Sequence, residues 1–586
     1  MDLAPLMARE LSSDELSMRF PAFALLLLAA AACGGERGGA GGAAGADGGT
    51  LVITTAGDAD GFTPALTNSI TSAQVEAQLF EKLAEPGLAL NTIGDVGFTP
   101  ELATSWTWSK DSLSIAFHLD PKAGWHDGRP VTARDVRFTW ELDRDSTAGS
   151  VMIDLIASID SVTVRDSLTP VFWFSHRAPE QFFVATYQMR IVPEHLLGAI
   201  PRKDLATTPF RQAPVGSGPF KFVKWDQRQA IVVEANREYH LGRPHLDRVI
   251  WSVAPDPNAM MLRLFTGDAD FLEFVRPGDF AEIAKHPELK TVNYPAFTYG
   301  FLQFNLRDPK DSKKPNALWS DRALRRALSM TVDRAALVKS VFDTLAVVGV
   351  GPLTHSYPTY DASLAQLPYA PDSAAKLLDA MGWRRGADGM RAKGGRPLAF
   401  TLLVPSSSAP RRQMAELLQG SLKQAGVKVE IEQLDFATFY QKLRSRAFDV
   451  AIGGINLDPS PGNLLQSWGS EHGGPGPTNF GSYDSPAFDA LVDTALSQMD
   501  PAAAKRYFAR AYQVIIDDAP AVWLYEPRSF AAMQKRVQPV GMRADGWWMT
   551  MREWSIPAAE RNARDKAAAL PPLAAPPPAP AAPAKP

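Results

Sequence analysis

Apolar residues recur along the chain with two different periods, which predicts a protein that mixes helices and strands. Leu51–Ile53 has the pattern of a short strand. Thr71 and Ser72 can cap a helix, and apolar residues follow them at helical spacing as far as Leu83. From Leu113 to Leu119 every second residue is apolar, which is typical of a half-buried strand. Both kinds of element are therefore expected early in the chain.

The clearest combination of the two periods lies in the second half of the chain. A helical spacing runs from Met414 to Ala425 and stops at Gly426, and Val427–Ile431 alternates immediately afterwards. A helix, a glycine stop and a strand in this order make an α/β unit. Another helix is predicted to begin at Asp372 and to end at Gly382. The pattern therefore favours the α/β class.

The N-terminus has the features of a secretory signal peptide. Phe20–Ala32 is almost wholly apolar, Arg19 precedes it, and small residues lead up to Cys33, the only cysteine. Ala-Ala-Cys after a Leu/Ala run resembles a lipoprotein signal-peptidase site. We therefore expect residues 1–32 to be removed and Cys33 to carry lipid; the alternative is a buried core thiol. The acidic residues before Met18 do not suit a signal peptide, so translation is expected to begin there.

Composition limits the remaining choices. The 586 residues carry a formal net charge of −4 and are 45% hydrophobic, which gives no electrostatic reason to bind nucleic acid. The chain is too long for one small core, so at least two lobes are expected. Residues 33–50 are mostly Gly and Ala and are predicted to form a flexible tether. Residues 558–586 become Pro/Ala-rich and are predicted to be a disordered tail.

Few residues suggest catalysis or a resident metal. His126 beside Asp127 could be a base with an orienting carboxylate, but no nucleophile accompanies the pair, and we interpret it as a structural turn. The nine histidines form no zinc-binding spacing. We therefore predict no catalytic residues, no metal site and no cofactor.

Five segments carry motifs of a known family. They hold LATSWTW and WHDGRPVTARDV (within 100–141), GSGPF, NREY and PHLD (within 214–226 and 236–251), FLQFNL with DRALRRALSMTVDRAALV (301–306 and 321–338), the helix 371–383, and YDSPAFDALVDTA (within 479–525). Together, in this order, they resemble the family 5 extracellular solute-binding proteins, the peptide- and nickel-binding subunits of ABC importers. The matches span nearly the whole mature chain.

The resemblance implies a two-lobed periplasmic-binding-protein fold with the ligand between the lobes. The first lobe is then built from 51–86, 216–296 and 515–557, an extra subdomain from 87–215, and the second lobe from 297–514. Lobes of this kind close over their ligand about a hinge. The resemblance places one crossing between units at Gly216, Ser217, Gly218 and Pro219, and we expect the hinge there.

The resemblance also indicates a ligand-binding loop. FDVAIGGINLDPSPGNLLQSW (448–468) is similar to the family's strand and loop whose aspartate pairs with the α-amine of a bound peptide, and Asp458 is the matching position. Gly454 and Ile455 precede it, Ile455 standing where the family usually has tryptophan. The alternative for Asp458 is a local turn before Pro459. Trp468, Trp523 and Tyr525 are candidates for the cleft wall, with core packing as their alternative.

These observations lead to one main hypothesis and two alternatives. The main hypothesis is a lipid-anchored, monomeric binding protein, exported from the cytoplasm, that passes a short peptide to ABC permease subunits. In this family an extended peptide is held through its main chain, with charged anchors at its ends. The first alternative is a binder of a sugar oligomer, a metal chelate or another small solute, which the isoleucine at 455 leaves open. The second is a secreted hydrolase, which would need a nucleophile and a base that we do not find.

Overall fold

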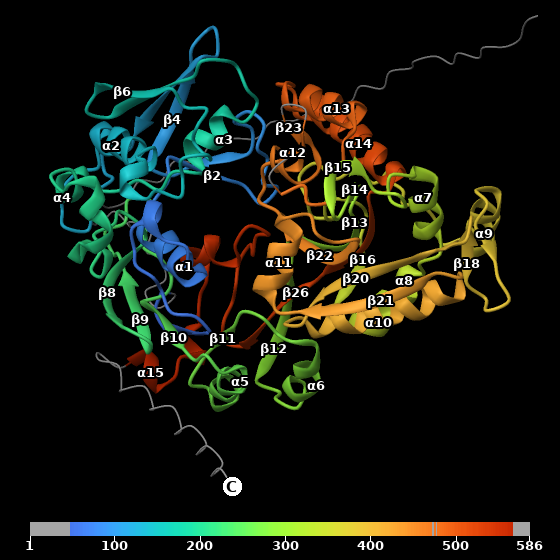
Figure 1. Ribbon diagram of the computed structural model, residues 1–586. Coiled ribbons are helices and arrows are strands. Elements are labelled where there is room, and N and C mark those ends of the chain that lie inside the picture. The colour runs from blue at the N-terminus through green and yellow to red at the C-terminus, as the bar shows by residue number, and fades with distance from the viewer. Residues whose placement is uncertain (1–46, 472–473, 476–477, 567–586) are drawn as a thin grey trace, which may run out of the picture. The chain divides into compact units, whose positions relative to one another are not determined.

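The computed structural model describes residues 47–471, 474–475 and 478–566, which form two large β-sheets and a smaller one (Figure 1). Cys33 and most of the predicted tether lie outside these residues. No helix in the described part of the chain is both long and apolar enough to cross a bilayer.

The first large sheet has seven strands, and β1 lies at its centre between two parallel neighbours, β10 and β11. In order, the strands are β12 Leu289–Tyr294, β26 Ser529–Gln534, β11 Phe271–Leu272, β1 Thr50–Thr55, β10 Arg248–Val253, β9 Ala230–Ala235 and β8 Phe220–Asp226. The helices of this part are α1 Ile70–Leu79, α5 Pro257–Thr266, α6 Phe280–Ile283 and α15 Ala563–Lys566.

The smaller sheet has four antiparallel strands, β4 Ala103–Trp108, β5 Ser114–Leu119, β7 Thr169–Trp173 and β6 Ser161–Asp166. Its helices are α2 Ala133–Asp143, α3 Gln181–Thr186 and α4 Glu194–Leu197. Most of its buried residues belong to the same hydrophobic cluster as part of the first large sheet, so the two share a core.

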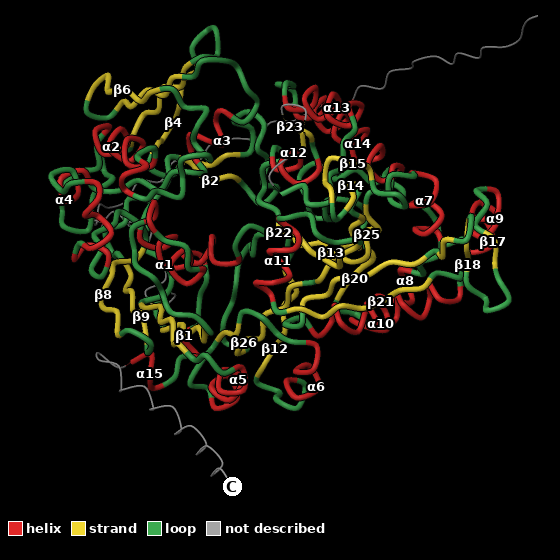
Figure 2. The backbone as a smooth tube through the Cα atoms, in the orientation of Figure 1, coloured by secondary structure: helices red, strands yellow, loops and turns green. Residues whose placement is uncertain are grey.

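The second large sheet has six strands, β16 Ala346–Val348, β25 Ala521–Pro527, β13 Thr298–Phe304, β22 Val450–Asn456, β20 Ala399–Pro405 and β21 Lys428–Leu434. Its helices are α7 Arg322–Met330, α8 Arg334–Phe342, α9 Pro371–Ala380, α10 Ala409–Gln424, α11 Phe436–Arg444, α12 Asn463–Trp468, α13 Pro486–Leu496 and α14 Pro501–Asp518. Helix α10 runs alongside β20 and β21 (Figure 2). This sheet has hydrophobic clusters of its own, so the predicted two-lobed α/β fold is confirmed.

The remaining strands form short ribbons. They are β2 Ala84–Pro86 with β3 Phe98–Pro100, β14 Arg307–Asp308 with β15 Asp311–Pro315, β23 Ser470–Glu471 with β24 Gly474–Pro475, and the three-stranded set β17 Arg384–Arg385, β18 Arg391–Lys393 and β19 Arg396–Pro397.

The strong sequence patterns gave the right elements, with differences at their ends. The unit of α10, Gly426 at φ +85° and β21 is as predicted. Helix α1 is capped by Ser69, whose hydroxyl accepts from the Thr71 backbone N–H, and not by Thr71 or Ser72. Strand β5 is nearly all buried and not half-buried, because it lies inside its sheet between β4 and β7 while α2 packs on the neighbouring strands β6 and β7.

The chain passes between the two large sheets twice. It leaves the first sheet after β12 and enters the second at β13, and it returns between β25 and β26. The return was expected at residue 515, which lies inside α14. Because β25 still pairs with β13, the return to the first sheet comes after Pro527.

The predicted flexible tether ends earlier than expected, and the predicted disordered tail begins later than expected. Gly48, inside the predicted tether, donates its backbone N–H to His245 O at 2.6 Å. In α15, inside the predicted tail, the Asp565 carboxylate accepts from the Thr50 backbone N–H at 2.7 Å and from Arg536 Nη1 at 2.6 Å. These bonds attach both segments to the first lobe, and composition alone does not predict them.

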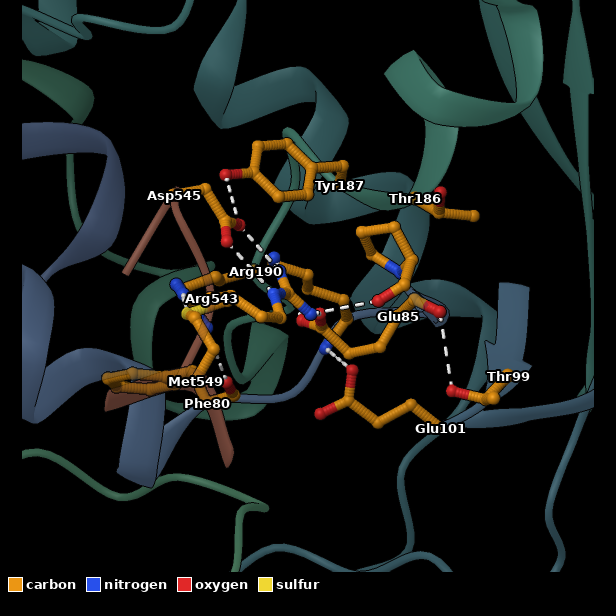
Figure 3. A network of polar contacts seen from close by, with 12 residues as sticks. Phe80, Glu85, Thr99, Glu101, Thr186, Tyr187, Arg190, Arg543, Asp545 and Met549 are labelled. Atoms are coloured by element: carbon orange, nitrogen blue, oxygen red, sulfur yellow. Dashed lines mark hydrogen bonds and ion pairs between the residues drawn. The ribbon is translucent and has the colours of Figure 1, made fainter. Parts of the chain in front are cut away.

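A buried network of charges ties the segment after β26 to the rest of its lobe (Figure 3). Arg543 donates to Glu85 Oε2 at 2.8 Å and pairs with Asp545, which accepts from the Tyr187 hydroxyl at 2.8 Å. Burial alone would raise the pKa of Glu85, but Lys82 and Arg543 outweigh it and hold the pKa at about 2. The buried charges are therefore compensated within the network.

Candidate functional site

A cavity of about 450 Å³ lies in the second lobe beside strand β22 and helix α11. Its apolar lining comes from Phe301, Phe436, Phe439, Tyr440, Leu443 and Phe480. Its polar lining includes Gln303, Asn456, Gln466, Ser467 and Thr478, and its charged lining is Arg411 and Asp458. A cavity that combines an apolar wall with a few polar groups has the composition of a ligand site.

One edge of β22 borders this cavity. Strand β22 pairs with β13 along its whole length, from Val450 to Asn456. On its other side it pairs with β20 only at Val450 and Ala451. Among the described strands, none pairs with that edge beyond Ala451, and Gly453–Asn456 line the cavity. Backbone groups on this edge can bind an additional extended segment.

Asp458 lies just after β22 and lines the cavity. Its Oδ1 accepts from the Ser460 backbone N–H at 2.7 Å. Asp458 therefore also forms the local turn around Pro459 that was the alternative to a ligand role. The buried Tyr357 hydroxyl lies 2.9 Å from the backbone oxygens of both Asp458 and Ser460. The loop is therefore held in place by the side chain of Tyr357.

A second carboxylate, Glu180, lies close to this loop. The Ser460 hydroxyl donates to Glu180 Oε2 at 2.8 Å, which joins the residue before α3 to the loop after β22. Burial raises the pKa of Glu180 to about 7; hydrogen bonds from Ser460 and Thr92 oppose the shift, and the charge of Asp458 adds to it. The two carboxylates, Glu180 and Asp458, are thus close enough for the charge of one to affect the other.

Of the predicted ligand residues, Gly454, Ile455 and Asp458 come together at the cavity, and the three aromatic residues do not. Trp468 and Trp523 are 1% and 2% exposed, and the Trp468 indole donates to the Tyr299 hydroxyl at 3.0 Å. Tyr525 is buried as well, and its ring occupies the space where a side chain at residue 300 would lie. Their alternative, core packing, is therefore the correct one.

The Gly216–Pro219 segment does not lie on either connection between the large sheets. It leads from the smaller sheet into β8, and it packs on the end of α1, where the Gly218 N–H donates to Leu79 O at 2.8 Å. A Cβ atom at Gly216 would lie 1.9 Å from that same carbonyl oxygen. The glycines here allow close packing and not the interlobe hinge that we expected.

His126 belongs to the same packed region. Its ring Nδ1 accepts from the Gly216 N–H at 3.2 Å, and its Nε2 lies 3.0 Å from Gly218 O. Burial lowers the pKa of His126 to about 4, so the ring is neutral at physiological pH. The Asp127 carboxylate contacts His195 Nε2 at 2.7 Å. The pair is structural, as interpreted from the sequence.

Two residues of the site had no usable sequence signal. Glu180 lies 280 positions from Ser460, and no motif connects them. Arg411 is the third residue of α10 and is one of several basic residues along that helix. No group of three or more His, Cys, Asp or Glu side chains within the described ranges has the arrangement of a metal site.

Comparison with known proteins gives consistent similarities. Residues 97–476 match the middle region of the bacterial extracellular solute-binding proteins, family 5. The oligopeptide-binding protein AppA of Bacillus subtilis (strain 168) is 28% identical over 502 residues, which cover 84% of this chain and 88% of AppA.

Solved structures agree with this result. The structure of AppA from Bacillus subtilis in complex with a nonapeptide has a TM-score of 0.68 at 27% identity, with 87% of this chain and 99% of AppA covered. NikZ from Campylobacter jejuni, solved with Ni(L-His), has the same fold at a TM-score of 0.68 and 22% identity, with 86% and 99% covered.

Proposed function

Because this chain belongs to the bacterial extracellular solute-binding proteins, family 5, we propose that it captures a short peptide outside the cytoplasm and delivers it to the permease subunits of an ABC importer. The similarity to AppA, an oligopeptide-binding protein whose structure holds a nonapeptide, supports a peptide ligand. In this role the protein binds its ligand without transforming it.

The observation that carries the proposal is the unpaired edge of β22 inside the cavity. A peptide in extended conformation can add to such an edge through main-chain hydrogen bonds, which do not depend on its sequence. Gly453 and Gly454 have no side chains that would keep the peptide away from the strand, and both line the cavity. This geometry suits a protein that accepts many different peptides.

The end of the edge suits a positive charge. Asp458 follows β22, and its charge contributes to the raised pKa of Glu180 nearby. A peptide's α-ammonium placed here would have a carboxylate within reach, as a buried cation requires. In this proposal Asp458 is the ammonium's ion-pair partner, and Glu180 supports it from the other side of the loop.

We expect the purified protein to bind peptides when it is offered an equimolar pool of peptides of two to nine residues. Native mass spectrometry identifies the bound species, and a pool of N-acetylated peptides is the control for the free amine. Binding of a sugar oligomer or a metal chelate, with no peptide bound, would contradict the peptide proposal and support the first alternative. Cleavage of the pool would support the hydrolase alternative.

We also infer that Cys33 becomes the lipid-bearing N-terminus and holds the protein at a membrane surface as a monomer. The support is the apolar segment Phe20–Ala32 directly before the single cysteine. Lipid on both the sulfur and the amine would bind firmly, whereas one acyl chain binds only marginally.

The anchor has a direct test. Mass spectrometry of the mature protein should find a lipid-modified Cys33 at the N-terminus. Cys33→Ser should move the protein from the membrane to the soluble fraction or leave the precursor uncleaved. An unmodified cysteine in a protein that stays in the membrane fraction would contradict the anchor.

A further inference from the structure

A second cavity, of about 380 Å³, lies between helix α1 and the end of helix α2, and we call it the α1 cavity. Ile70, Ala73 and Glu76 line it from one face of α1, at a spacing of three residues. Asp143, the last residue of α2, lines it as well. No residue lines both this cavity and the cavity beside β22, so the α1 cavity is a separate candidate site.

Asp143 brings a buried carboxylate without a partner to this cavity. Its residue is 4% exposed, and among the described residues no donor and no cation bonds to the carboxylate. Burial raises the pKa of Asp143 well above its usual value, and no hydrogen bond or neighbouring charge opposes the shift. The C-terminal end of a helix carries partial negative charge, which disfavours ionisation of Asp143 further. An ionised carboxylate here requires a cation that the described part of the chain does not supply.

The nearest groups that could satisfy Asp143 bond elsewhere. Arg144 is the next residue, but its Nη1 donates to the main-chain oxygens of Ile159 at 3.3 Å and Asp160 at 3.0 Å. The Ser150 hydroxyl donates to the main-chain oxygen of Asp143 at 2.8 Å. The carboxylate is therefore left for a group that enters the cavity.

Each of the other charged residues of the lining has a partner within the described part of the protein. The pairs are Lys82 with Glu85 at 2.8 Å, Glu76 with the Thr67 hydroxyl at 3.0 Å, Asp545 with the Tyr187 hydroxyl at 2.8 Å, and Arg190 with Phe80 O at 3.3 Å. The residues of the last two pairs are drawn in Figure 3. Asp143 differs from all of them, so the lining as a whole lacks one positive group.

The lining also offers apolar contacts for the rest of a ligand. Ile70 is 52% exposed and Val151 is 44% exposed, although both side chains are large and aliphatic. Met152 and Trp548 line the cavity beside them. Exposed apolar side chains at a cavity can cover the aliphatic stem of a cation, as they do for lysine and arginine within proteins.

From this arrangement we propose that the α1 cavity binds an ammonium or guanidinium group on a short apolar stem, with the Asp143 carboxylate as its ion-pair partner. The cation has two chemical sources, a lysine or arginine side chain of the captured peptide and a free small amine or guanidine. The first source rests on the proposed peptide-binding function, and the second does not.

The test compares the wild type with Asp143→Asn, which keeps the shape of the side chain and removes its charge. Asp154→Asn is the matched control, because Asp154 is exposed and does not line the cavity. Two pools of pentapeptides differ at one position, which is lysine or arginine in the first and norleucine in the second. Calorimetry measures their affinities. Butylamine and butylguanidinium are the small cations and butanol is the neutral control, and the urea midpoint of unfolding reports their binding.

We expect the wild type to bind the lysine and arginine pool about tenfold more tightly than the norleucine pool if a peptide side chain is the source. If a free cation is the source, butylamine or butylguanidinium should raise the urea midpoint of the wild type, and butanol should not. Either effect should be lost in Asp143→Asn and kept in Asp154→Asn.

The stability of the variant separates a binding role from a structural one. Without ligand, Asp143→Asn should unfold at a urea concentration equal to that of the wild type or higher, since a buried carboxylate without a partner costs stability. A clear fall in the midpoint would mean that Asp143 stabilises the fold, which would contradict the inference.

The inference is also overturned if the wild type binds both pools equally well and neither small cation raises its urea midpoint more than butanol does. A preference for the lysine and arginine pool that persists in folded Asp143→Asn would overturn it too. If the wild type binds no pentapeptide, the proposed function fails, and the small cations alone decide. A midpoint that rises in the wild type and not in Asp143→Asn would then support the inference, and no rise would refute it.

Discussion

Asp458→Asn is expected to weaken the binding of free-amine peptides by about 2–5 kcal/mol, the typical loss when one member of a buried, hydrogen-bonded charge pair is removed. This corresponds to roughly 30-fold to several-thousand-fold in affinity. The loss exceeds that of an exposed ion pair because a bound peptide displaces water from the loop after β22. Asparagine can still accept from the Ser460 N–H, so the turn should persist.

The decisive measurement is a two-by-two titration by calorimetry. Wild type and Asp458→Asn are each titrated with a peptide and with its N-acetylated form. If the Asp458 carboxylate binds the peptide's α-ammonium, acetylation weakens binding to the wild type and has little further effect on the variant. Additive losses would mean that Asp458 acts on binding without contacting the amine.

The chain offers a matched control for the charge change. Asp361 accepts from the Ser363 N–H at 2.9 Å, in the same two-residue turn that Asp458 makes with Ser460, but it does not line the cavity. Asp361→Asn should therefore leave peptide affinity unchanged. An equal loss in both variants would point to an indirect effect of net charge.

What the sequence predicted well depends on short segments. The helix, Gly426 and strand of the α10 unit can be read from adjacent residues, and so can the position of Asp458 in a loop after an alternating strand. Such local patterns follow from the periods of helices and strands, which do not require knowledge of the fold. They give the correct element even where its first residue is wrong, as at α1.

What the sequence could not give depends on contacts between distant segments. The pairing of Glu180 with Ser460 joins two lobes, and an apolar strand such as β25 fits either sheet equally well by its pattern. Trp468 and Trp523 illustrate the same limit, because a large aromatic residue suits a ligand wall and a core alike. Only the tertiary structure decides between them.

Gly216 shows this limit most directly, since a glycine is equally consistent with a flexible hinge and with close packing. In the fold a Cβ atom there would lie 1.9 Å from Leu79 O and 2.7 Å from Leu79 C, both main-chain atoms that cannot move without shifting the end of α1. The same shift would break the bonds between the neutral His126 ring and the segment. Packing therefore requires glycine at this position.

Gly216→Ala is accordingly expected to lower the free energy of unfolding by about 3 kcal/mol or more, in the upper range of overpacking effects. Urea denaturation followed by tryptophan fluorescence, with midpoints and slopes compared, measures the change. Gly420→Ala is the matched control: residue 420 is an exposed position inside α10 with no atom within 4 Å of an added Cβ, so alanine should raise stability there by about 0.5–1 kcal/mol. If Gly216→Ala instead unfolds like the wild type and changes only how far the protein compacts on binding peptide, measured by small-angle scattering, the segment would be the hinge after all.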